Sequence, residues 1–145
     1  MQEVEEVERA CVCHNLRKTS RAITQFYDKV LAPSGINSTQ LALLRRISIG
    51  NSSTVSQISK EMCMDRTTLT RSLELLKRQD LIQIESSSDR RKRIVTITSK
   101  GATRINKAFP LWEKAQRVIM EKFRKGNWRE IKMGLSDLSK IATLN

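Results

Sequence analysis

The spacing of the apolar residues changes once along this chain, and that change most constrains its fold. Through most of the sequence, apolar residues recur every three or four positions, which is the period of an amphipathic helix. At Ile82 and Ile84, and again at Val95 and Ile97, they alternate with polar neighbours, as in a strand. The polar, basic stretch 86–93 between them predicts the tip of an antiparallel hairpin. We therefore expect a mainly α fold that carries one small β-hairpin.

Capping residues and helix breakers predict where the helices begin and end. A long first helix should run from about residue 5 to residue 31 and end at Pro33–Gly35. Pro110 lies inside a later helix and should kink it, because proline removes one backbone donor. The predicted starts of the other helices are, in chain order, Ser38, the capping box Thr54–Gln57, Asp65 for a helix over about 66–79, Ser99 and Asn127.

Residues 54–79 have the form of a helix-turn-helix, with a tight turn at 63–65. On the second helix, three leucines fall on one face, and Thr67 and Arg71 point the other way. Arginine can fork onto guanine, and threonine can donate to a base or touch a thymine methyl, so this face suits a major groove. The alternative is an ordinary amphipathic helix with a polar exterior.

The hairpin tip carries four adjacent cations, Arg90, Arg91, Lys92 and Arg93. Because they repel one another, fold stability does not explain them, whereas a phosphate backbone or a narrow minor groove does. Asp89 would hold one of these arginines by a charge-assisted hydrogen bond. The alternative is a solvated charged turn. The chain has 27 Lys and Arg against 15 Asp and Glu, a net charge of +12, which also favours a polyanionic partner.

A helix-turn-helix followed by a basic hairpin is a winged helix, and three motifs resemble the MarR family of transcriptional regulators. Asp89-x-Arg91 followed by Ile97-Thr98 resembles the wing signature of that family, with Ile in place of Leu. Residues 64–71 resemble the start of its recognition helix, and residues 109–116 resemble part of the helix after the wing.

The resemblance implies a single MarR-like domain over residues 1–145 and a homodimer. Residues 36–100 would form the winged helix-turn-helix lobe that binds DNA. Residues 1–34 and 102–145 would form a helical dimerisation region. It further implies a sequence-specific repressor, bound to a pseudopalindromic operator and released by a small aromatic effector. We expect it in the cytoplasm because the N-terminus has no signal pattern.

Positions carried over from the family give the predicted DNA contacts. Arg71 and the threonines beside it would face the major groove, and Arg91 would enter the minor groove. The whole predicted set is Ser56, Arg66, Thr67, Thr68, Thr70, Arg71, Asp89, Arg90, Arg91, Lys92 and Arg93.

Cysteines in the first helix leave a second hypothesis open. Cys11 and Cys13, with His14 beside them, could make the chain a thiol-based redox sensor on the same scaffold. Buried, inert thiols are the alternative, and we expect Cys63 to pack inside the helix-turn-helix. The cluster lacks the second ligand pair of a structural zinc site, so we predict no metal and no cofactor.

Other classes of protein have little support in the sequence. The chain has no G-x-S-x-G motif and no Walker loop, so we do not expect an enzyme. No apolar run is long enough to span a membrane, and the acidic N-terminus does not resemble a signal peptide. A winged helix that binds another protein instead of DNA stays a third hypothesis.

Overall fold

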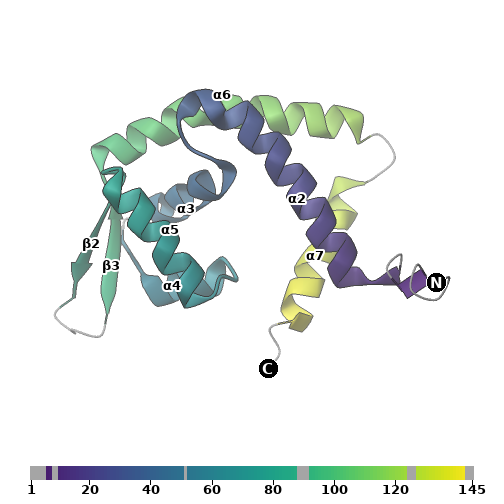
Figure 1. The fold of residues 1–145 in the computed structure, drawn as a ribbon, viewed down its shortest axis with the longest axis horizontal. Coiled ribbons are helices and arrows are strands. Elements are labelled where there is room, and N and C mark those ends of the chain that lie inside the picture. Colours follow the sequence, from purple (N-terminus) through teal and green to yellow (C-terminus); the bar gives the residue numbers. More distant parts are fainter. Residues whose placement is uncertain (1–5, 8–9, 51, 88–91, 124–126, 143–145) are drawn as a thin grey trace. The chain divides into compact units, whose positions relative to one another are not determined.

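The computed structural model describes residues 6–7, 10–50, 52–87, 92–123 and 127–142, and it is mainly helical with one small sheet (Figure 1). This confirms the predicted fold class. The elements are, in chain order, α2 (Val12–Leu31), the 3₁₀ turn η1 (Ala32–Ser34), α3 (Ser38–Ile49), β1 (Ser53–Thr54), α4 (Val55–Glu61), α5 (Arg66–Arg78), β2 (Ile82–Ser86), β3 (Arg93–Ile97), α6 (Ser99–Lys122) and α7 (Trp128–Ala142).

The sheet is antiparallel and has the strand order β1-β3-β2. In the predicted hairpin, Ile84 of β2 lies opposite Val95 of β3, and Ser86 lies opposite Arg93. On the other side of β3, Ser53 of β1 also pairs with Val95. The sequence did not indicate β1, because two residues are too few to show an alternating period.

The chain divides into two compact units, residues 1–115 and 116–145, and α6 contributes to both. In the first unit, apolar side chains from seven elements and from two connecting segments form one core. Three leucines of α5 belong to it and are at most 1% exposed. The core residues are Leu31, Ile36, Leu41, Leu43, Leu44, Ile47, Ile58, Leu69, Leu73, Leu76, Leu81, Ile82, Val95 and Ala108.

Two predicted caps are displaced by one residue. The N-cap of α3 is Asn37, which forms a capping box with Gln40. Ser38 instead donates its backbone N–H (2.7 Å) and its hydroxyl (2.6 Å) to Asp28 Oδ1, and so ties α3 to α2. At the start of α6, Gly101 N–H donates to Thr98 Oγ1 at 2.9 Å, so Thr98 and not Ser99 supplies the cap.

The first long helix begins later than predicted. Cys11 is extended, with ψ 112°, and its Sγ accepts a hydrogen bond from His14 N–H at 3.4 Å, so α2 begins at Val12. Glu6, Val7 and Ala10 are helical on the other side of this break. The apolar period continues across position 11 and therefore did not reveal it.

The start of α6 is fixed tightly to the base of the hairpin. Thr98 donates its hydroxyl to the carbonyl oxygen of Asp80 at 2.6 Å and its N–H to Leu81 O at 3.1 Å. A Cβ on Gly101 would collide with that same Leu81 oxygen, so only glycine fits there. The helix continues through Pro110 to Lys122.

In the second unit, α7 begins where the sequence predicts. Asn127 accepts from Arg129 N–H at 3.1 Å and donates to Glu130 Oε1 at 3.0 Å. No α7 side chain is buried, and Trp128 (42%) and Leu138 (40%) on its apolar face are exposed. Among the residues that the structure describes, no helix is both long and apolar enough to cross a bilayer.

Asp65 is the N-cap of α5, as predicted. Its Oδ1 accepts from Thr68 N–H at 2.9 Å, and its Oδ2 accepts from the Thr68 hydroxyl at 2.6 Å. Both bonds favour the ionised carboxylate and so hold the pKa of Asp65 below its ordinary value of 3.8. The bond from the Thr68 hydroxyl has the larger effect, and the bond from the Thr68 N–H has the smaller one.

The lowered pKa of Asp65 predicts how the stability of the chain depends on pH. Its stabilising effect should be complete above pH 3.8 and should be lost as the pH falls through the lowered pKa. An Asp65→Asn variant keeps one acceptor but loses the charge, so it should melt at a lower temperature than the wild type at pH 7. Thermal melts from pH 7 to pH 2.5 should show this difference shrinking in acid. A difference that stays constant with pH would contradict the assigned role.

Candidate nucleic-acid interface

Helices α4 and α5 form the predicted helix-turn-helix, closed by two hydrogen bonds across its turn. The Ser59 hydroxyl donates to Met64 O at 2.6 Å, and Met64 N–H donates back to Ser59 O at 3.0 Å. Cys63 lies between them with φ 50°, in the left-handed region. These contacts fix where α5 begins relative to α4.

The prediction that Cys63 packs inside the motif is wrong. Its side chain is exposed, and Sγ lies 4.0 Å from Lys60 O. The left-handed backbone places this residue on the outside of the turn, while Ile58 and Leu69 on either side fill the core. The sequence position at the corner was therefore a poor guide to burial.

The orientation of α5 agrees with the helical wheel. Its leucines at 69, 73 and 76 are buried, and Thr67, Thr68 and Arg71 are exposed on the outward side. The Thr68 hydroxyl already donates its proton to Asp65, so it offers a ligand only its oxygen lone pairs and its methyl group. Thr67 and Arg71 remain the side chains on the outward face of the first two turns that can donate to a base, whereas Arg66, also exposed, lines a hollow beside α4 and β3.

A hollow of about 260 Å³ lies between the start of α4, the start of α5 and strand β3. Three of its lining side chains are cationic, namely Arg66, Lys92 and Arg93. Hydroxyl groups from both helices complete the wall. The lining residues are Thr54, Val55, Ser56, Arg66, Thr70, Lys92 and Arg93. Cations and hydroxyls converging in this way suit a phosphate group.

The structure brings five of the predicted site residues to this hollow. Ser56, Arg66 and Thr70 reach it from the two helices, and Lys92 and Arg93 reach it from the wing. Thr70 is half-buried and faces the hollow, so it lies apart from the outward face of α5. Sequence reasoning missed Thr54, although its position as the N-cap of α4 could have revealed it.

The wing is described up to the base of its tip. Ser87 N–H donates to Lys92 O at 2.9 Å, which continues the hairpin beyond the Ser86–Arg93 pair. Lys92 and Arg93 are exposed. The predicted contacts Asp89, Arg90 and Arg91 lie outside the described residues.

The predicted redox residues lie away from this interface, at the start of α2. Cys11 is half-buried, Cys13 and His14 are exposed, and Cys11 and Cys13 are free thiols. Within the described part of the chain, no group of three or more His, Cys, Asp or Glu side chains is arranged to hold a metal ion.

The chain resembles known proteins in both sequence and fold. The model of the MarR family matches residues 34–92. No curated protein matches the sequence. A solved structure of the M. tuberculosis transcriptional regulator MosR in complex with DNA has 33% identity and a TM-score of 0.84, and the match covers 91% of this chain and 96% of that one.

Two more distant structures share the fold. E. coli MarR, as a mutant complexed with operator DNA, has 17% identity and a TM-score of 0.80, covering 91% of this chain and 96% of that one. BpsR of Bordetella bronchiseptica has 21% identity and a TM-score of 0.75, and the match covers 94% of this chain and 96% of that one. The DNA binding of BpsR is regulated by 6-hydroxynicotinic acid.

The winged helix, the family match and the identity to MosR over nearly the whole chain agree with one another. They confirm the predicted family and the expectation of a regulator rather than an enzyme. The chain belongs to the MarR family of DNA-binding transcriptional regulators.

Proposed function

We propose that this chain is a sequence-specific, homodimeric repressor that binds duplex DNA with α5 and the wing. One observation carries the proposal: cations and hydroxyls from α4, α5 and β3 converge on one hollow beside the exposed face of α5. Binding to a protein partner would not explain why cations and hydroxyls line one hollow. A regulator acting on DNA would also work in the cytoplasm, as the sequence predicts.

The two parts of the interface have different proposed tasks. Arg66, Lys92 and Arg93 in the hollow would hold a backbone phosphate, which fixes position but carries no sequence information. Arg71 and Thr67 on the exposed face of α5 would contact base edges in the major groove. Asp89, Arg90 and Arg91 remain proposed contacts on the sequence argument alone.

The exposed apolar faces of α2 and α7 support the proposed dimer. On α7, Trp128, Leu135 and Leu138 are about 40% exposed. On α2, Leu16 and Ile23 are 38% exposed. Apolar side chains repeated along amphipathic helices are costly to leave in water, and a second copy would cover them. A two-fold dimer would then need two half-sites about one helical turn apart.

We propose a small aromatic effector as the regulator of DNA binding. BpsR, whose DNA binding is regulated by 6-hydroxynicotinic acid, has the same fold. In this chain, Arg45 lies over the stacked rings of Phe109 and Trp112, whose centroids are 5.6 Å apart. Phe109 is exposed and Trp112 is half-buried, and a cation beside two such rings suits an aromatic acid.

Oxidation of the N-terminal thiols is a second candidate for regulation, and their exposure favours it. Cys13 is exposed and Cys11 is half-buried, so the hypothesis of buried, inert thiols has lost its main support. Peroxide could take two electrons from a thiolate here and leave a sulfenic acid, with hydroxide as the other product.

The first prediction separates base recognition from phosphate binding. Arg71→Ala should weaken binding to the preferred duplex by about 1–3 kcal/mol and relax base preference, because it removes a bidentate contact. Lys92→Ala should weaken binding to all duplexes alike and lower the salt slope by about one, because it removes a phosphate contact. Fluorescence titrations at several salt concentrations measure both.

Lys132→Ala is the control for these titrations, because it removes one exposed charge from α7. It should change neither the base preference nor the salt slope. If neither Arg71→Ala nor Lys92→Ala alters binding to any duplex, the proposed DNA-binding role would be contradicted. The alternative, a winged helix that binds another protein, would then be favoured.

The second prediction concerns the dimer. Leu138→Glu places a charge on the apolar face of α7 and should turn a dimer into a monomer in sedimentation experiments, because burying the charge would be costly. Binding of DNA should weaken with it, because one half-site alone remains. Ser136→Glu, on the opposite, polar face of α7, should stay dimeric. A wild-type chain that is monomeric at micromolar concentration would contradict the proposed assembly.

The third prediction tests the thiols. Mild peroxide should modify Cys13 in intact-mass and peptide-mass spectra and should weaken DNA binding. A Cys63→Ser variant should respond in the same way, because the proposal assigns the regulatory oxidation to Cys11 and Cys13 and not to the third free thiol. Unmodified Cys11 and Cys13 together with unchanged DNA binding would exclude the redox hypothesis.

A further inference from the structure

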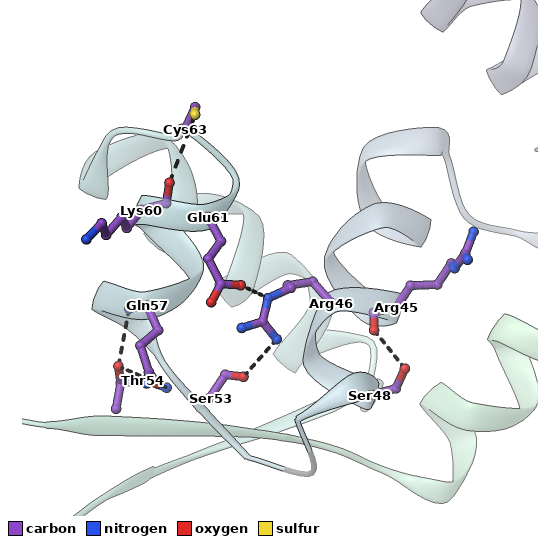
Figure 2. Close-up of polar contacts among 9 residues, drawn as sticks. All are labelled: Arg45, Arg46, Ser48, Ser53, Thr54, Gln57, Lys60, Glu61 and Cys63. Carbon is purple, nitrogen blue, oxygen red and sulfur yellow. Dashed lines mark hydrogen bonds and ion pairs between the residues drawn. The ribbon is translucent and has the colours of Figure 1, made fainter. Parts of the chain in front are cut away.

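Two successive arginines of α3 point to different parts of the first unit (Figure 2). The guanidinium of Arg45 lies 5.1 Å from the ring centroid of Trp112, on α6. The guanidinium of Arg46 points toward the helix-turn-helix, where its Nε donates to Glu61 Oε2 and its Nη1 donates to Ser53 Oγ at 3.4 Å. Arg46 therefore has one partner on α4 and one on β1.

The two partners of Arg46 lie at the bases of the two segments that carry the proposed DNA contacts. Glu61 is the last residue of α4, directly before the turn that leads into α5. Ser53 is 3% exposed and pairs with Val95 of β3, the strand that begins at Arg93, next to Lys92. One guanidinium thus joins the end of α4, just before the turn that leads into α5, to β1, which pairs with the wing strand β3.

The chemistry of this contact makes it directional. The side chain of Arg46 is only 22% exposed and that of Glu61 is 47% exposed, so water screens the pair incompletely. Arginine presents several donors in one rigid plane, and fixing two partners with that plane also fixes the angle between them. A lysine ammonium at this position would keep the charge but would not set that angle.

We propose that Arg46 is a positioning residue that sets the orientation of α5 relative to the wing, and thereby the ability to discriminate between DNA sequences. It would do so without touching DNA, because its described donors face Glu61 and Ser53. The inference rests on the proposed function, in which α5 contacts bases and the hollow holds a phosphate. A recognition helix that can tilt would keep its phosphate contacts and lose its base contacts first.

The Glu61→Gln variant gives the sharpest test, because two accounts predict opposite results. If Arg46 or its surroundings acted on DNA by charge alone, removing a carboxylate would tighten binding to every duplex. If Arg46 positions α5 through Glu61, the variant should bind the preferred duplex more weakly. The measured quantity is the ratio of affinities for the preferred duplex and for a scrambled duplex of the same length and composition, at one salt concentration.

We expect this ratio to fall about tenfold in Glu61→Gln and in Arg46→Gln, as for the loss of one charge-assisted hydrogen bond. Arg46→Lys should lower it too, although it keeps the charge. Two variants are matched controls: Arg17→Gln removes one exposed arginine charge from α2, and Glu121→Gln removes an exposed carboxylate from α6. Both should leave the ratio unchanged.

The ratio also separates positioning from general stability, because a smaller folded fraction weakens binding to both duplexes equally. An unchanged ratio in Arg46→Lys and Glu61→Gln, or tighter binding of both duplexes by Glu61→Gln, would overturn the inference while leaving the proposed function intact. A wild-type chain that binds the two duplexes equally would overturn sequence-specific binding itself, and the inference with it.

Discussion

Burial of the leucine face of α5 is the interaction on which the rest of the interface depends. Leu69, Leu73 and Leu76 are at most 1% exposed, and burying each contributes about 1.5–3 kcal/mol. A rotation of the helix by one residue would turn it by about 100° and would exchange a buried leucine for a polar side chain. The core therefore fixes which side chains face outward, and Thr67 and Arg71 are exposed as a consequence.

A wing held close to this helix completes the surface. Strand β3 pairs on both edges, and the start of α6 is fixed to the hairpin by Thr98 and Gly101. The hollow lined by Arg66, Lys92 and Arg93 exists only because these segments meet. Arg46 bonds to the end of α4 and to β1, and in the proposed account it sets orientation without supplying charge to the DNA.

The helices and the hairpin could be predicted from the sequence because each leaves a repeated pattern over many positions. The spacing of three leucines predicted which face of α5 is buried and which is exposed, and Asp65 predicted where the helix begins. Single-residue features could not be predicted in this way. Asn37 and Thr98 cap helices one residue before the serines that the pattern favoured, and Cys63 is exposed because of a left-handed backbone that no side-chain period reveals. The pairing of β1 and the hydrogen bonds of Arg46 depend on contacts distant in sequence.

Selection of bound duplexes from a random pool tests the central claim most directly, because it reports specificity and symmetry together. A dimer that docks two copies of α5 should enrich one pseudopalindrome whose half-sites are centred about one helical turn apart. Enrichment of an unsymmetrical site, or of no sequence at all, would contradict sequence-specific recognition by paired recognition helices.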